Sequence, residues 1–257
     1  MKKRKLGRNR GIWCGKIVTN LELNHELQNK EKTHVIERFF KFFIETEVGT
    51  KDNENEKASV LPVIISETKL KEFSITPKKG DIVFLKGPWR TYDKEMPHSN
   101  RTKLEQYIFV KQIEVHEEFS VKTRNKIEFK GVLVDKIFVK ERDENGHMIK
   151  KNGKFVNVLD ENEKPIPTTR KKDGKIINDF TVAVNRPNGS DYIPAVASFK
   201  LAEFIAYQLE IGAEIECFGY TRSREYELKS NGQVGIAYEA VINRLNVIEP
   251  EEEKSEK

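Results

Sequence analysis

The chain has 257 residues, of which 34% are charged, and its 15 Phe give it enough apolar bulk for one large core or two small ones. No apolar run approaches the roughly 18 residues that a membrane span needs. Cys14 and Cys217 stand far apart without Cys-x-x-Cys partners, which argues against a disulfide framework and a zinc cluster. We therefore expect a protein of the reducing cytoplasm that uses neither metal nor cofactor.

The formal charge of +5 is concentrated at one end. Residues 1–10 hold six Lys and Arg and no acidic residue, whereas residues 249–257 hold five Glu against two Lys. The body between them is nearly balanced. The ends are either solvated tails or a phosphate-attracting arm and a partner-recruiting acidic tail. Charge alone does not choose between these two interpretations.

In chain order, strand-like runs rich in Val, Ile, Phe and Tyr recur between turn residues. They are Ile12–Val18, Phe39–Thr46, Val60–Ser66, Asp81–Lys86, Tyr107–Val115, Ile127–Val134, Asp179–Asn185, Tyr192–Phe199, Glu214–Phe218 and Ala237–Val247. Only Thr68–Phe73 and Lys200–Leu209 favour a helix. Ten strands with two short helices do not indicate alternating β-α units.

An internal repeat explains this count. Seven identities share one offset of 132 residues: Pro62/Pro194, Ser66/Ser198, Gly80/Gly212, Gly87/Gly219, Arg90/Arg222, Val115/Val247 and Glu117/Glu249. Each copy has five strands with a helix between the third and fourth, which is the order of the five-stranded Greek-key barrel, the OB-fold. The sequence therefore predicts an all-β fold with short helices, made of two tandem five-stranded OB-fold barrels. We expect a basic arm at 1–10, barrels at 11–118 and 127–249, a linker at 119–126 and an acidic tail at 250–257.

The second copy carries about 22 extra residues between its first two strands. This insertion, residues 140–175, is charged and contains Asn145-Gly146 and Asn152-Gly153, both hairpin signals. We interpret it as a long hairpin or a partly mobile loop with a strand-guiding role.

The fourth strand of the second copy has an outward face suited to nucleic acid. Ile215 and Cys217 should point inward, because Glu214 and Glu216 cannot, and side chains alternate along a strand. That parity places outside Phe218, Tyr220, Arg222, Arg224 and Tyr226. Tyr rings provide π surfaces for unstacked bases, and guanidinium groups provide phosphate contacts. Ordinary cross-strand pairing of Tyr and Arg on an exposed sheet is the alternative.

The first copy offers a thinner version of this face. Lys86, Arg90 and Tyr92 lie outward, whereas Trp89 and Trp13 are expected in the core. In the second strand Phe42 and Phe43 point to opposite faces, and parity makes Phe43 the outward candidate.

No enzyme motif is present, and the five His have no metal-ligand spacing. We therefore predict no catalytic residues.

Four segments of the second copy resemble, in order and spacing, the bacterial single-stranded DNA-binding protein family: INDFTVAVNR from Ile177, DYIPAVA from Asp191, KLAE from Lys200 and GYTRSREY from Gly219. The first copy fits more loosely, and the whole chain resembles a tandem form. The resemblance implies stacking on Tyr192 and Tyr226, and phosphate contacts from Arg222 and Arg224. The chain departs from the family by having Ser198 where an aromatic residue often stands, and by lacking a terminal Pro-Phe.

These features together predict sequence-tolerant binding of single-stranded DNA in replication, recombination or repair. The expected site residues are Tyr192, Tyr220, Arg222, Arg224 and Tyr226, joined by Arg90, Tyr92, Lys86 and Phe43. The resemblance implies association with the nucleoid, and it implies four assembled barrels, hence a homodimer. An RNA-binding OB protein and a protein-interaction module on the same scaffold stay open as alternatives.

Overall fold

A computed structural model describes residues 6–47, 58–95, 102–116, 124–168, 176–227 and 233–249. The expected basic residues 2–5, the end of the insertion at 169–175 and the acidic tail at 250–257 lie outside the described residues. The elements are β1 (Arg8–Ile17), β2 (Glu22–Gln28), β3 (Val35–Thr46), β4 (Ser59–Ser66), α1 (Glu67–Glu72), β5 (Ile82–Gly87), β6 (Trp89–Glu95), β7 (Thr102–Phe109), β8 (Gln112–His116), β9 (Asn125–Ile137), β10 (Lys150–Lys151), β11 (Lys154–Phe155), β12 (Ile177–Arg186), β13 (Gly189–Ser198), α2 (Phe199–Tyr207), β14 (Glu214–Glu227) and β15 (Val234–Val247).

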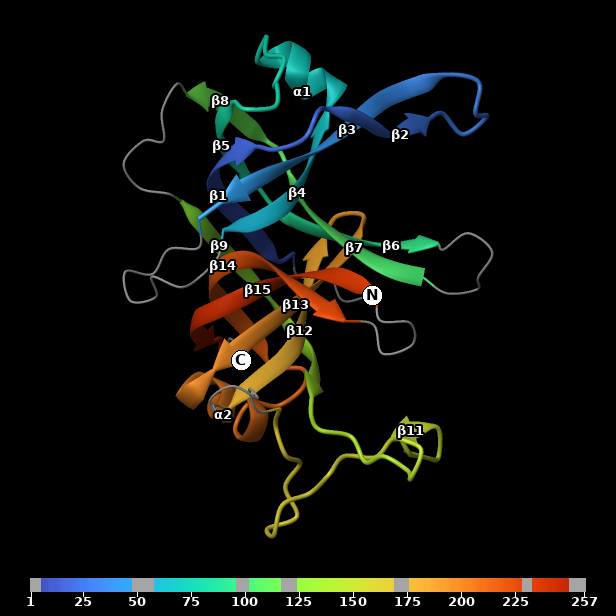
Figure 1. Cartoon of the computed structure of the whole chain (residues 1–257), viewed down its shortest axis with the longest axis vertical. Helices are drawn as coiled ribbons and strands as arrows, with labels where there is room; N and C mark the ends of the chain where they lie inside the picture. The colour runs from blue at the N-terminus through green and yellow to red at the C-terminus, as the bar shows by residue number, and fades with distance from the viewer. Residues whose placement is uncertain are drawn as a thin grey trace, which may run out of the picture.

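The strands form two five-stranded OB-fold barrels, stacked along the long axis of the molecule with α1 and α2 at opposite ends (Figure 1). In the first barrel β1 pairs with β3 and β5, β3 with β4, and β4 in parallel with β7. The pairs β5–β8 and β6–β7 close the ring, with strands four and five each broken in two. In the second barrel the ring runs β9–β12–β13–β15–β14 and returns to β9, again with one parallel pair, β13–β15. The predicted fold class is confirmed.

Two pairs of glycines serve the same purpose in both barrels. Gly80 and Gly212 have φ angles of 102° and 98°, which an L side chain rarely adopts, and each opens the turn into strand four. Gly87 and Gly219 lie where a Cβ atom would collide with the carbonyl of strand five, at Phe109 and Val241 respectively. At these two positions strand four approaches the backbone of strand five too closely for any residue but glycine.

The two barrels are joined through their first strands. β1 pairs antiparallel with β9 over six positions, from Arg8 opposite Lys130 to Trp13 opposite Asn125. This pairing draws residues 8–10 of the expected arm and residues 125–126 of the expected linker into strands, whereas residues 119–123 of that linker lie outside the described residues. Arg8 and Arg10 form ion pairs with Glu128 instead of standing free.

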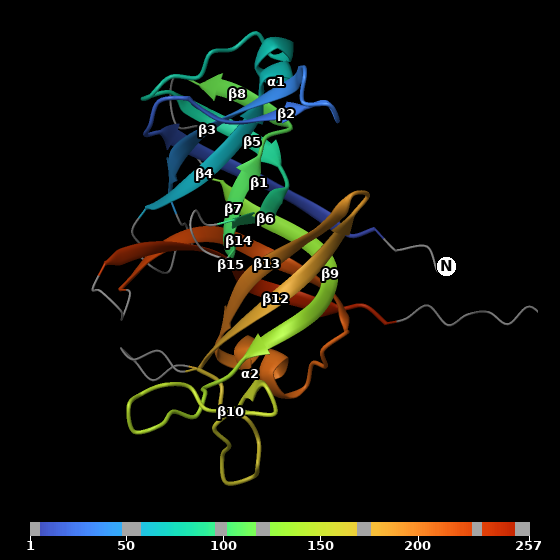
Figure 2. The ribbon, with the colours of Figure 1, turned by 90° about the vertical axis from the view of Figure 1, so that its right-hand side faces the viewer.

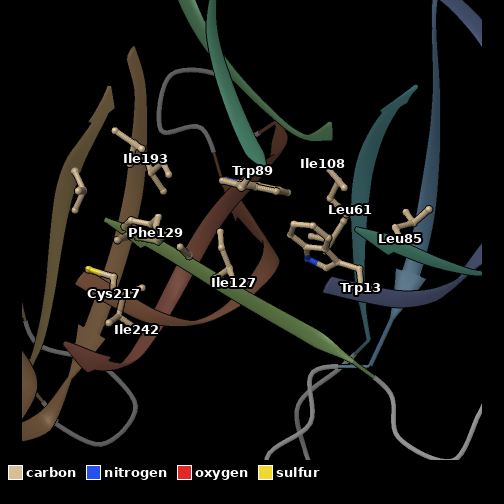
Figure 3. Packing of buried hydrophobic residues seen from close by; sticks show 14 of the residues in the cluster. Trp13, Leu61, Leu85, Trp89, Ile108, Ile127, Phe129, Ile193, Cys217 and Ile242 are labelled. Carbon is tan, nitrogen blue, oxygen red and sulfur yellow. The ribbon is translucent and has the colours of Figure 1, made fainter. Parts of the chain in front are cut away.

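The buried residues of the two barrels form one continuous core cluster. In Figure 3, Trp13 and Trp89 lie between Leu61 and Leu85 on one side and residues of the second barrel on the other. Both Trp side chains are fully buried, as the sequence predicts. Trp13 Nε1 donates to Thr221 Oγ1 of β14 at 2.9 Å, a hydrogen bond that crosses between the barrels. We call this region the seam.

The insertion between β9 and β12 forms an ordered arm, residues 138–168. The β10–β11 hairpin turns at Asn152 and Gly153, both with positive φ, as a type I′ turn requires. Isolated bridges extend this ladder on both sides: Phe138 with Pro167, Lys140 with Asn157, Arg142 with Met148 and Leu159 with Pro165. The described part of the insertion is therefore a compact ladder of hairpins.

No helix within the described ranges is long and apolar enough to cross a membrane. Across the same ranges no group of three or more His, Cys, Asp and Glu side chains could hold a metal ion.

Candidate nucleic-acid interface

A series of ring contacts runs across the outer face of the first barrel. His25 stacks on Phe39 with centroids 4.6 Å apart, Phe39 lies 6.1 Å from Phe109, and Phe109 lies 6.4 Å from Tyr107. Tyr107 then meets Tyr92 edge-on at 5.6 Å. Alternation along β3 and β7 produces this arrangement, because the residues between these rings point into the core. We call the five residues the aromatic row.

Cations accompany the row. Arg90 and Lys111 lie 5.7 Å and 5.0 Å from the centre of the Phe109 ring, a cation–π distance. Burial and the nearby Arg90 charge lower the pKa of Lys111. Partly buried aromatic rings flanked by positive groups can stack bases and contact phosphates at once.

Glu105 connects the row to a second feature of the surface. Its carboxylate accepts a hydrogen bond from the Tyr92 hydroxyl at 2.8 Å and pairs with Lys94 at 3.2 Å and with Lys41 at 4.0 Å. Burial would raise the pKa of Glu105, but these partners hold it below its usual value. Lys41 also lies 5.2 Å over the ring of Phe43.

Lys41 and Glu105 line a groove of about 810 Å³ between the barrels. One wall belongs to the first barrel, at β3, β4 and β7, and the other to β12, β13 and the β14–β15 hairpin. Figure 2 shows this hairpin reaching along the boundary between the barrels. Tyr226 lines the groove, 38% exposed, and its ring lies against Gly235, where any Cβ would collide with it. The glycine thus makes room for the ring.

A paired arginine cluster fills the second-barrel side. Arg222 and Arg224 both use Nε to donate to the buried carboxylate of Glu239, at 2.8 Å and 3.1 Å. Asp179 also lines the groove, and its pKa is raised by burial and by the nearby charge of Glu239, which the two arginines only partly offset. The cluster therefore fixes the arginine stems while their side chains remain a third to a half exposed.

A buried carboxylate holds the two barrels together beside the row. Asp191, 2% exposed, accepts from the backbone N–H of Thr91 and lies 3.6 Å from Arg90 and 3.4 Å from Arg186. The backbone N–H of Tyr192 in turn donates to Thr91 Oγ1 at 2.8 Å. Arg90 and Tyr192 are thereby positioned from opposite barrels at the same junction.

The structure brings most of the predicted residues onto one surface. Arg224 and Tyr226 line the groove, while Arg222, Tyr92 and Phe43 each contact a residue that lines it. Arg90 lies on the row, and Tyr192, 48% exposed, lies at the Asp191 junction.

Two predicted residues do not join this surface. Lys86 precedes the break at Pro88, and its ammonium lies 5.3 Å over the ring of Phe84. Phe84 also lies within cation–π distance of Arg124, so Lys86 belongs to a separate cluster. Tyr220 is half-buried opposite Val241 in the barrel wall and is not one of the described residues that line the groove.

The sequence interpretation missed the aromatic row except for Tyr92. Glu105, Tyr107 and Phe109 alternate with Gln106 and Ile108, which are both buried. This alternation is present in the sequence and could have indicated the row. The stacking of His25 on Phe39 had no such signal, because β2 was not predicted as a strand.

No family model and no curated protein sequence matches the chain. The fold is similar to that of the single-stranded DNA binding protein from Thermus aquaticus. A deletion mutant of that protein aligns with a TM-score of 0.64 at 13% identity, covering 98% of this chain and 99% of the other. The wild-type structure gives a TM-score of 0.61, also at 13% identity, with 96% of each chain covered. Both barrels therefore have counterparts, in the same arrangement, in a known fold.

Proposed function

We propose that the chain binds single-stranded DNA, without catalysis and with little sequence preference, along the aromatic row and the inter-barrel groove. The observation that carries this proposal is the unbroken series of rings from His25 to Tyr92, joined through Glu105 to the groove that holds Tyr226. Every base has a π face, so such a path tolerates sequence variation. The fold shared with a DNA-binding protein from Thermus aquaticus supports the same assignment.

In this proposal bases stack on the rings of the aromatic row, which include Tyr92, and on those of Tyr192, Tyr226 and Phe43. Arg90, Arg222 and Arg224 contact phosphates. Each phosphate contact should steepen the salt dependence of log K by about 0.7. We further propose service in replication, recombination or repair, and a homodimer that assembles four barrels, which light scattering of the purified chain would measure.

The test is titration of labelled oligo-dT with the wild-type chain and with the Tyr192→Ala/Tyr226→Ala double variant. Each stacked base contributes about 1–3 kcal/mol, so loss of two should weaken binding at least about 30-fold at moderate salt. Tyr207→Ala is the matched control, because Tyr207 is 41% exposed but lies on α2. Equal affinity of the double variant and the wild type would refute the stacking surface.

Competition of poly(dT) against poly(U) separates DNA from RNA as the ligand. Preference for poly(U) would overturn the DNA assignment while leaving the surface intact.

A further inference from the structure

The arm begins directly after Ile137, which lines the inter-barrel groove, and its outer part lies away from the proposed binding surface. In both ribbon views it extends beyond α2, on the side of the second barrel away from the first (Figures 1 and 2). Lys164 of the arm lies 5.8 Å over the ring of Tyr207 on α2, and Phe138 at the base of the arm is 9% exposed. The base is therefore packed against the barrel, and the outer part projects from it.

The arm has two different faces. Residues paired directly across an antiparallel ladder point to the same side, and successive pairs alternate. Lys140 Nζ donates to Asn157 Oδ1 at 2.6 Å, and Lys150 Nζ lies 4.5 Å over the ring of Phe155, which places these pairs on one side. Through the bridges this side carries Lys140, Arg142, Met148, Lys150, Phe155 and Leu159. We call it the basic arm face.

Three cations and no carboxylate occupy this face. The acidic residues of the arm lie elsewhere: Asp143 and Asp160 each accept two backbone N–H hydrogen bonds in the turns. Glu141 points to the opposite side from its neighbours Lys140 and Arg142. The sorting of charge between face and turns makes the face attractive to a polyanion although the arm as a whole is nearly neutral.

Apolar groups on the same face remain open. Phe155 is 43% exposed, Met148 44% and Leu159 50%. A half-exposed ring among cations has the composition of the proposed surface in the groove, where base stacking and phosphate contact are combined.

We propose that the basic arm face is a second contact for single-stranded DNA. It would hold a stretch of the strand that has left the inter-barrel groove, with phosphates at Lys140, Arg142 and Lys150 and a base on Phe155. This inference rests on the proposed function, and it adds that the bound length exceeds what the barrels alone can cover.

The test compares two charge-matched double variants in the full chain. Lys140→Gln/Lys150→Gln removes two cations from the basic arm face. Lys151→Gln/Lys154→Gln removes two cations from the opposite side of the same hairpin, where these two residues are cross-strand neighbours. Each is titrated with a short oligo-dT of about 12 nucleotides and with a long one of about 45, since an OB-fold covers about 4–16. DNA is kept in excess so that one protein binds each strand.

On the long strand the face variant should reduce the magnitude of the salt slope of log K by about 1.4, and it should weaken binding on the order of tenfold at 0.1 M salt. On the short strand it should match the wild type, and the opposite-side variant should match the wild type on both. Equal losses in the two variants, or no length dependence, would overturn the inference. A wild-type chain that binds neither strand would instead refute the proposed function, and circular dichroism of each variant excludes misfolding as the cause.

Discussion

Trp13→Phe tests whether the two barrels behave as one folding unit. Trp13 is fully buried at the seam, where its ring centroid lies 6.4 Å from that of Trp89, and its indole N–H donates to Thr221 Oγ1. Phenylalanine removes that hydrogen bond, worth about 1 kcal/mol net. It also leaves a void of roughly 40 Å³, which at ~24 cal/mol per Å³ costs about 1 kcal/mol more.

The sum is a loss of about 2 kcal/mol in the free energy of unfolding, with Thr221 still bonded to Asn125. With an m-value of roughly 3 kcal/mol per molar urea, the midpoint should fall by about 0.7 M. The assay is urea unfolding of wild type and variant, followed by far-UV circular dichroism for both barrels and by intrinsic fluorescence for the seam. The two probes should shift together in a single transition.

Ile17→Val is the companion variant, because Ile17 is buried in the first barrel, where it pairs with Ile44 of β3. It should also shift the entire dichroism transition, by a smaller amount. Two dichroism transitions of which only one moves, or a fluorescence change that precedes the dichroism change, would refute the idea that the seam couples the barrels.

Two further predictions concern local interactions. The raised pKa of Asp179 means that the native state binds its proton more readily than the unfolded state does, so the ionised group destabilises the fold as pH rises above about 3.8. Asp179→Asn should therefore raise the urea midpoint at pH 7 and have a smaller effect at pH 3. A larger effect at pH 3 than at pH 7 would contradict the assigned burial. Ser66 caps α1 by accepting from the Lys69 backbone N–H, whereas Ser198 before α2 makes no such bond; Ser66→Ala should therefore cost about 1 kcal/mol and Ser198→Ala clearly less, and equal costs would argue against the cap.

Sequence periodicity was sufficient to predict the strands of the barrels, because the alternation of inward and outward side chains is a local signal. Alternation placed Ile215 and Cys217 inside, and both are fully buried. The ten expected strands are all present, although Tyr107–Val115 is broken between β7 and β8. β2 was missed because its polar composition does not favour a strand, and pairing with β3 stabilises it. β6 continues strand four past the break at Pro88, and the parity that placed Arg90 and Tyr92 outward extended through it.

The proposed binding surface was only half predictable for a different reason. The parity of a strand shows that Arg224 and Tyr226 face outward, but it does not show what lies opposite them. Lys41 and Glu105 reach the same groove from the other barrel, and no local pattern connects residues so distant in the chain.

The sequence by itself determined that two OB-folds follow one another, because each strand and turn signal lies within its own repeat. Only the tertiary structure decided that the barrels share one core and one surface. The physical reason is the antiparallel pairing of β1 with β9, which satisfies the backbone groups of both first strands and buries Trp13 and Trp89 between the barrels. Because of that pairing, the chain forms a single structure with a groove between its halves rather than two separate domains.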